Sequence, residues 1–257
     1  MSRYRKIICE PLHDGQVLGL TLSSPKGNVL DCEMIGELTE AVRCRAARPP
    51  VKALLFQGQG EHFCYGASVA EHQKEQAEGM LKALRGLLCS LIQAGRPCLA
   101  LVRGCCLGGG LELAAFCHWI FASEEARFGQ PEINLGVFPP VASLILPYRI
   151  GQSASDDLVL SGRLISAHEA WELGLVNSVS PQPEKDAGDF LAAHILPKSA
   201  ASLHWAAKAA RFAMHSAFMK DIEAVERIYL DSLMETEDAN EGIQAFLEKR
   251  QPVWKDR

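Results

Sequence analysis

The chain has 257 residues, of which 48% are apolar and 22% are charged, and its formal net charge is −5. This length and composition predict one large globular domain, or one domain with an appendage, with enough apolar residues for a substantial core. The slightly acidic balance argues against nucleic acid or an anionic membrane surface as a partner.

The start of the chain is basic but does not have the pattern of a signal peptide. Met1 to Lys6 runs into Ile7-Ile8-Cys9-Glu10-Pro11 rather than into an apolar segment with a cleavage site. The longest apolar stretches, such as Pro97 to Val102, fall far short of the roughly 20 residues needed to span a bilayer. We therefore expect a cytoplasmic protein with no membrane association.

In chain order, short apolar runs bounded by Gly, Pro or charged residues predict strands. They lie at 17–22, 51–56, 97–102 and 119–122. Helical patterns lie between them, at 32–47, 75–94 and 109–117. Strands separated by helices imply crossover connections and a buried sheet, so the pattern predicts an α/β architecture.

The strand pattern ends near Pro181. Beyond it, residues 199–214, 221–233 and 237–249 carry apolar residues at spacings of three and four, which predicts helices. We accordingly divide the chain into a core, residues 1–195, and a helical C-terminal region, residues 196–257. The apolar faces of this region must cover the core or pack against another subunit.

The nine cysteines are predicted to be reduced packing residues. They include no C-x-x-C pair and no neighbouring His at metal-ligand spacing, so we expect no metal site. A single nucleophilic cysteine is the alternative, although a free cysteine usually behaves as a small buried apolar residue.

Two glycine-rich segments follow predicted strands, Gly58 to Ser68 and Gly104 to Leu113. Small residues allow a ligand to approach the backbone closely. The second segment also opens a helix, whose first amides have no internal partners and favour negative charge. One amide from each segment could stabilise an oxyanion, although a glycine run before a helix is often only a tight turn. The segment contains neither a dinucleotide fingerprint nor a P-loop.

Two carboxylates stand out near these segments. Glu112 lies one turn into an otherwise apolar helix, where a charge is costly unless it has a partner or a function. Glu132 follows twenty residues later among apolar and turn residues. Taken singly, Glu112 could simply complement the helix dipole and Glu132 could be an ordinary loop acid. Together, two carboxylates beside an oxyanion site could deliver the hydroxyl and the proton of one water.

Several short motifs, in this order and at these spacings, resemble the crotonase (enoyl-CoA hydratase/isomerase) superfamily over essentially the whole chain. The motifs are residues 63–68 (FCYGAS), 108–112 (GGGLE), 128–132 (FGQPE), 160–167 (LSGRLISA), 170–176 (AWELGLV) and 246–250 (FLEKR). The resemblance implies a spiral of ββα turns followed by a helical C-terminal region, assembled as a homotrimer or homohexamer. It also implies an acyl-CoA thioester as substrate and no metal or redox cofactor.

The resemblance also implies roles for individual residues. By motif position, the amides of Ala67 and Gly109 form an oxyanion hole for the thioester carbonyl. Glu112 and Glu132 match the two glutamates that work with one water in the hydratases. Residues expected to contact the CoA moiety are Lys26, Tyr65, Ser68, Val69 and Lys249, although an exposed lysine is usually only solvated.

Two segments depart from the common hydratase pattern. Ser68 stands where Asp is usual, and residues 136–143 read GVFPPVAS in place of a glycine-rich stretch. Bulky residues there are expected to reshape the acyl pocket. Residues 66–72 and 136–143 are most similar to hydratases that act on a cyclic dienoyl-CoA in anaerobic aromatic degradation.

Other functions remain as alternatives at this point. A straight-chain enoyl-CoA hydratase is the nearest rival. An enoyl-CoA isomerase typically relies on one carboxylate, so the pair favours hydration. A non-catalytic binding homologue would lack a glutamate or carry a basic face. The histidines are scattered singly and predict surface or packing roles, with His72 an exception because it follows the first donor segment.

Overall fold

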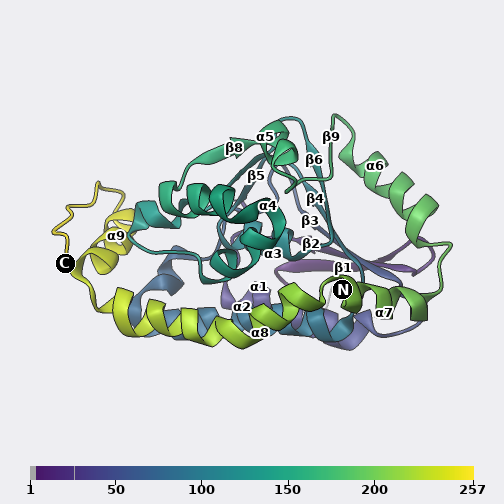
Figure 1. Cartoon of the computed structure of the whole chain (residues 1–257), viewed down its shortest axis with the longest axis horizontal. Helices are drawn as coiled ribbons and strands as arrows, with labels where there is room; N and C mark the ends of the chain where they lie inside the picture. Colours follow the sequence, from purple (N-terminus) through teal and green to yellow (C-terminus); the bar gives the residue numbers. More distant parts are fainter. Residues whose placement is uncertain (1–3, 26) are drawn as a thin grey trace.

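The computed structural model describes residues 4–25 and 27–257. Its main sheet has six strands in the order β1-β2-β3-β4-β6-β9 (Figure 1). These strands are β1 (Ile7–Leu12), β2 (Val17–Leu22), β3 (Ala53–Gly58), β4 (Cys98–Val102), β6 (Trp119–Ser123) and β9 (Ser178–Ser180). Only the β1–β2 pair is antiparallel among the neighbours in this sheet. A second sheet consists of β5 (Cys105–Leu107), β7 (Arg127–Gly129) and β8 (Leu164–Ser166).

Helices provide the crossovers that parallel strands require. In chain order they are α1 (Cys32–Ala41), α2 (Lys74–Ala94), α3 (Gly109–Phe116), α4 (Pro140–Ser161), α5 (Ala167–Glu172), α6 (Pro183–Phe190), α7 (Ala200–Ala210), α8 (Phe212–Arg227) and α9 (Glu237–Leu247). Short turns of other helix types are η1 (Val42–Ala46), η2 (Val69–His72), η3 (Pro131–Leu135), η4 (Leu191–Ile195), η5 (Ile228–Ser232) and η6 (Leu233–Glu235). The predicted α/β architecture is confirmed.

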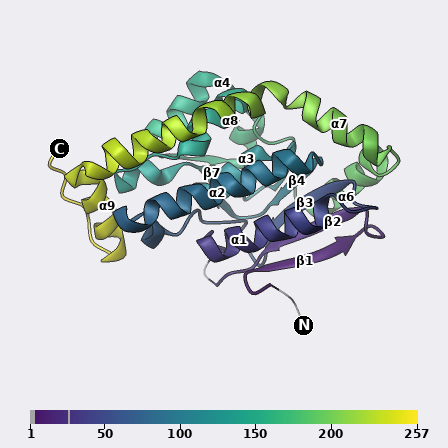
Figure 2. The same cartoon turned by 90° about the horizontal axis from the view of Figure 1, so that it is seen from below.

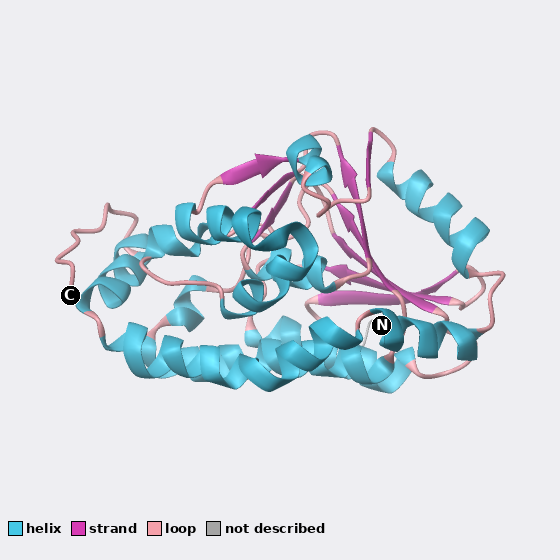
Figure 3. Cartoon of the chain, in the orientation of Figure 1, coloured by secondary structure: helices cyan, strands magenta, loops and turns pink. Residues whose placement is uncertain are grey.

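The main sheet is buried on both faces, as its unbroken apolar runs predict. Along β4, Cys98, Ala100 and Val102 point into the main core, while Leu99 and Leu101 point to the opposite face. This alternation is the two-residue period of a strand. Helix α6 and turn η4 cover that opposite face, and Figure 3 shows helices enclosing the strands.

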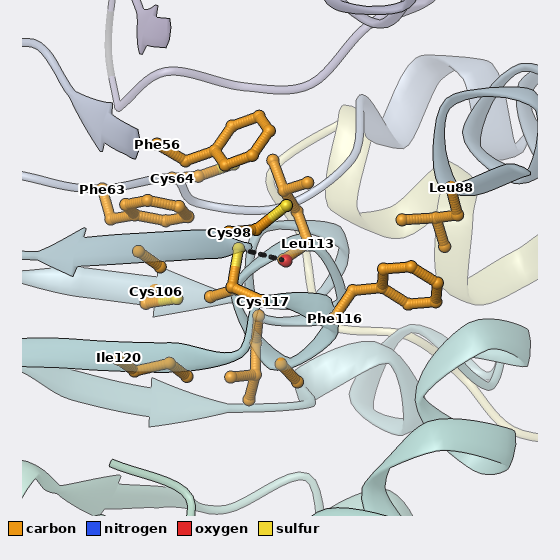
Figure 4. Close-up of a cluster of buried hydrophobic side chains, with 14 of the residues drawn as sticks. Phe56, Phe63, Cys64, Leu88, Cys98, Cys106, Leu113, Phe116, Cys117 and Ile120 are labelled. Atoms are coloured by element: carbon orange, nitrogen blue, oxygen red, sulfur yellow. Dashed lines mark hydrogen bonds between the residues drawn. The ribbon is translucent and has the colours of Figure 1, made fainter. Parts of the chain in front are cut away.

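The main core combines aromatic side chains with buried thiols (Figure 4). All nine cysteines are free, and Cys64, Cys98, Cys106 and Cys117 are buried. Burial raises the pKa of all four of these thiols, so they remain protonated and pack as small apolar groups. The predicted packing role therefore fits these four cysteines, whereas Cys32 is exposed and the remaining four are partly buried.

The C-terminal helices lie against the rest of the fold. Met214, Phe218 and Ile222 of α8 belong to the main core, and α8 runs beside α2 and α4 (Figure 2). None of the helices in residues 4–25 and 27–257 combines the length and apolar character that a bilayer span requires.

Some element boundaries differ from the sequence-based expectation. The helix expected over 199–214 is interrupted at Arg211, whose φ is −108° and whose guanidinium donates to the Cys117 carbonyl at 2.8 Å. The helix expected over 221–233 begins earlier, at Phe212. Strands β5 and β7 span only three residues each, too few for a periodic pattern.

Candidate active site

Three extended segments lie side by side and bring the predicted site residues together. Strands β5 and β7 pair in parallel, and Cys64 forms a parallel bridge with Cys106 on the other side of β5. Parallel segments end at the same edge of a sheet. The residues that follow each segment, Ala67, Gly109 and Glu132, therefore meet at one place.

Two glycines at this edge adopt conformations that favour glycine. Gly66 has φ of +111° and Gly108 has φ of +49°. A Cβ added at Gly108 would lie 2.5 Å from Oε1 of Glu132, so the carboxyl group packs directly against the Gly108 backbone. The glycines therefore allow the first loop, the start of α3 and Glu132 to approach closely.

The amides of Ala67 and Gly109 are neighbours. A Cβ added at Gly109 would lie 3.2 Å from the Ala67 nitrogen. The backbone groups next to these two amides already have hydrogen-bond partners. Leu30 N–H donates to the Gly66 carbonyl, and Gly108 N–H donates to the Gly129 carbonyl, both at 2.9 Å. Within the described ranges, neither the Ala67 nor the Gly109 amide has a protein acceptor. Two unpaired donors therefore lie next to each other at the start of a helix.

Both glutamates are buried beside these amides. Glu112 is 4% exposed, and its Oε1 accepts a hydrogen bond of 2.8 Å from the Ala142 amide. Glu132 is 8% exposed. In the amide orientation that satisfies both groups, Gln130 donates to the two Glu132 oxygens at 3.1 and 3.2 Å. Both carboxyl groups are therefore held in place by hydrogen bonds.

Burial shifts the titration of both carboxyl groups. Loss of solvation raises the pKa of Glu112 to about 7, although the amides of Ala142 and Val141 oppose the shift. Loss of solvation, together with the charge of Glu112, raises the pKa of Glu132 to about 8. Near neutral pH, the pair can therefore hold one proton and one charge, which suits an acid and a base acting together.

These groups line one small cavity of about 20 Å³. Its polar lining comprises Ala67, Gly109, Glu112, Glu132, His72 and Glu226, and its apolar lining comprises Met80, Leu81, Leu84, Phe138, Pro139, Pro140 and Val141. Residues 138–141, which the sequence singled out as bulky and rigid, therefore form part of the cavity wall. An apolar cavity with a few converging polar groups is typical of a small-molecule site.

The other predicted contact residues lie outside this cavity. Tyr65 is exposed; its ring packs over Gly27 and its hydroxyl hydrogen-bonds with Nε2 of His62 at 2.9 Å. Ser68 and Val69 continue the first loop into η2. Lys249 is exposed beyond α9, and Lys26 lies outside the described residues.

Sequence patterns alone do not identify two of the polar groups near the cavity. Tyr229, from η5, is wholly buried, and its hydroxyl hydrogen-bonds with Nδ1 of His72 at 2.9 Å. Glu226 lies on α8, more than a hundred residues from either loop. Both residues come from the C-terminal helices. The only sequence feature that pointed to this part of the site was the position of His72 directly after the first loop. No group of His, Cys, Asp and Glu among the described residues is arranged to hold a metal ion.

The chain is similar to several known proteins. Residues 13–257 match the family described as enoyl-CoA hydratase/isomerase. The chain is 43% identical over 244 residues to the cyclohexa-1,5-dienecarbonyl-CoA hydratase of Thauera aromatica, covering 95% of each chain. It is 34% identical to the 2,3-dehydroadipyl-CoA hydratase of Escherichia coli, covering 94% of this chain and 96% of that protein. The crystal structure of an enoyl-CoA hydratase/isomerase from Xanthobacter autotrophicus is similar with a TM-score of 0.85 at 28% identity, covering 95% of this chain and 94% of that one.

Proposed function

We propose that this chain, which belongs to the enoyl-CoA hydratase/isomerase family, hydrates cyclohexa-1,5-diene-1-carbonyl-CoA as a step in anaerobic aromatic degradation. The observation that supports this most strongly is the pair of buried glutamates beside two unpaired amides, in a chain 43% identical to a hydratase of that name. The cavity wall of Phe138, Pro139 and Pro140 favours a compact acyl group over a long, flexible one.

The amides of Ala67 and Gly109 donate to the thioester oxygen in this proposal. When water adds to the conjugated double bond, negative charge moves onto that oxygen and an enolate forms. Fixed donors at the position of the developing charge stabilise the transition state more than the ground state. The positive end of α3 adds to the effect, because Gly109 is its first residue.

Glu112 and Glu132 share the water. One carboxylate takes a proton from the water while the water oxygen forms a bond to one carbon of the conjugated system. The other carboxyl group then donates a proton to a second carbon as the enolate collapses. Overall, one water is consumed and both carboxyl groups can return to their starting states by exchanging a proton. The hydration reaction needs no oxidant or reductant, and we propose that no cofactor takes part.

The CoA moiety lies along the first loop in this proposal. Tyr65, Ser68 and Val69 follow one another just outside the cavity that holds Ala67, so they are placed to contact a chain leading out of it. Lys249 supplies positive charge for a phosphate, which would require the C-terminal end to approach the ligand.

We further propose that the active protein is a homotrimer or homohexamer, with residues 196–257 as the oligomerisation and CoA-covering region. Large apolar side chains on the C-terminal helices remain exposed, including Trp205 at 67% and Phe212 at 71%. Exposed apolar side chains of this size favour subunit contacts. Light scattering coupled to size exclusion distinguishes three copies from six.

The test of function is incubation of the purified protein with cyclohexa-1,5-diene-1-carbonyl-CoA and, separately, with crotonyl-CoA. Hydration is followed by chromatography and by the mass gain of one water. Rapid hydration of the cyclic diene supports the proposal. A preference for crotonyl-CoA would identify a straight-chain hydratase instead, and double-bond migration without mass gain would identify an isomerase. The Glu132→Gln variant should lose activity by about 100-fold or more, whereas the exposed control Glu78→Gln should retain it.

A further inference from the structure

His72, which lines the cavity, and Tyr229, which hydrogen-bonds with it, form a second polar pair that the proposed mechanism does not use. His72 lies at the end of η2, directly after the first loop, and is only 8% exposed. Its Nδ1 is 2.9 Å from the hydroxyl of Tyr229, which is wholly buried and whose ring packs edge-on against Phe138. The imidazole is thereby held from behind by a residue of the C-terminal helices.

The Tyr229 contact is compatible with a proton on either nitrogen of His72, because a phenol hydroxyl can both donate and accept a hydrogen bond. Burial lowers the pKa of His72 to about 4, so the ring is neutral near pH 7. Burial, together with the charges of Glu132 and Glu112, raises the pKa of Tyr229, so its hydroxyl keeps its proton. In the tautomer in which the phenol donates to Nδ1, the hydrogen of the neutral imidazole lies on Nε2.

In that tautomer, the Nε2 hydrogen is available to a ligand. Among the residues that the structure describes, none accepts a hydrogen bond from Nε2. The Nε2 atom is also not fully buried, so a ligand can reach it. His72 lines the same cavity as Glu112 and Glu132. It contributes the only neutral side-chain N–H donor of the described cavity lining.

The backbone opposite offers few other donors. Pro139 and Pro140 have no N–H group. The amides of Val141 and Ala142 are directed to Glu112. The amides of Ala67 and Gly109 are assigned to the thioester oxygen. A water that donates to both carboxyl groups still has lone pairs on its oxygen that can accept a hydrogen bond.

We propose that His72, held by Tyr229, donates a hydrogen bond from Nε2 to the oxygen atom that is added: first the reacting water, then the hydroxyl group of the product. His72 is thus a substrate-contacting residue that favours the hydrated acyl group over the same group without oxygen. A site built to hydrogen-bond a hydroxyl discriminates against a ligand that lacks it, because the buried donor is then left unpaired. This inference rests on the proposed function, since it assigns a role within that site.

The test compares two ligands that differ only by one hydroxyl group, 2-hydroxycyclohexane-1-carbonyl-CoA and cyclohexane-1-carbonyl-CoA. Their dissociation constants are measured by calorimetry for wild type, His72→Met and His72→Gln. Loss of one buried hydrogen bond should lower the preference for the hydroxylated ligand about tenfold in His72→Met, with binding of the other ligand unchanged. His72→Gln retains an N–H donor and should restore most of the preference.

Two further variants separate a ligand contact from a structural role. His215→Met removes a partly buried imidazole from a different cavity, so the preference should stay at the wild-type value. Tyr229→Phe keeps the ring against Phe138 but removes the hydroxyl, and should lower the preference by about two- to fivefold. Because Tyr229→Phe leaves His72 in place, the ligand preference of this variant still tests the inference if His72→Met does not fold.

The outcomes distinguish this inference from the proposed function. If wild type hydrates neither substrate but His72→Met still loses the hydroxyl preference, the reaction assignment fails and the donor role stands. If wild type is an active hydratase and the preference is the same in wild type, His72→Met and Tyr229→Phe, the donor role is overturned. Equal weakening of both ligands in His72→Met would also overturn it, because that result indicates lost packing.

Discussion

Replacing Glu132 by glutamine tests the burial of the carboxyl pair through stability rather than through turnover. Burial and the charge of Glu112 raise the pKa of Glu132 from 4.5 to about 8 in the folded protein. Between these two values, the unfolded chain releases a proton that the folded protein retains. The free energy of unfolding therefore falls as the pH rises through this range, and the contribution is fully present only below pH 4.5.

The size of the effect follows from the pKa values. Each pH unit between the two pKa values costs about 1.4 kcal/mol, so raising the pH from 5.5 to 8 should cost wild type about 3 kcal/mol through this group. Glutamine cannot ionise and has nearly the same shape. Glu132→Gln should therefore gain about 3 kcal/mol relative to wild type over this interval while losing hydratase activity.

The assay is urea denaturation at pH 5.5 and pH 8, at one fixed protein concentration because subunit association adds to apparent stability. Glu78→Gln is the matched control, since Glu78 is exposed and pairs with Lys82 at the surface. Its stability should change with pH in parallel with wild type. If Glu132→Gln also runs parallel to wild type between pH 5.5 and pH 8, Glu132 ionises normally and the argument from burial is wrong.

Three other perturbations have defined outcomes. A plot of log kcat/KM against pH should be bell-shaped, with a maximum between the pKa values of about 7 for Glu112 and about 8 for Glu132. The reason is that one carboxyl group must be protonated and the other charged. A flat profile from pH 6 to 9 would contradict this. Phe138→Ala should enlarge the cavity and raise kcat/KM for crotonyl-CoA relative to the cyclic diene, as measured in a competition assay. Phe218→Ala should lower the free energy of unfolding by about 3–5 kcal/mol, as measured by urea denaturation, because Phe218 packs in the main core against Phe116.

Much of this protein could be predicted from local sequence. Apolar runs at 17–22, 97–102 and 119–122 coincide with β2, β4 and β6, because a strand buried on both faces needs no polar alternation. Glu112 was conspicuous because a charge in an apolar helix requires a reason, and the structure places it in the cavity wall. The glycine-rich loops were equally visible, because few other residues allow such close approach of backbone segments.

Other features required the folded chain. Strands β5 and β7 are too short to show a period, yet their pairing brings Gly108 against Glu132. The raised pKa values depend on burial, which sequence spacing does not give.

The hydrogen bond between His72 and Tyr229 shows most clearly what could not be predicted from the sequence. The two residues are 157 positions apart in the chain, and they meet only because the C-terminal helices fold back over the first loop. Local sequence determined the strands, the helix starts and the residue types of the site, because these depend on neighbouring side chains and backbone preferences. Tertiary structure alone decided which of those residues share a cavity and how they ionise, because proximity and desolvation arise from packing between distant segments.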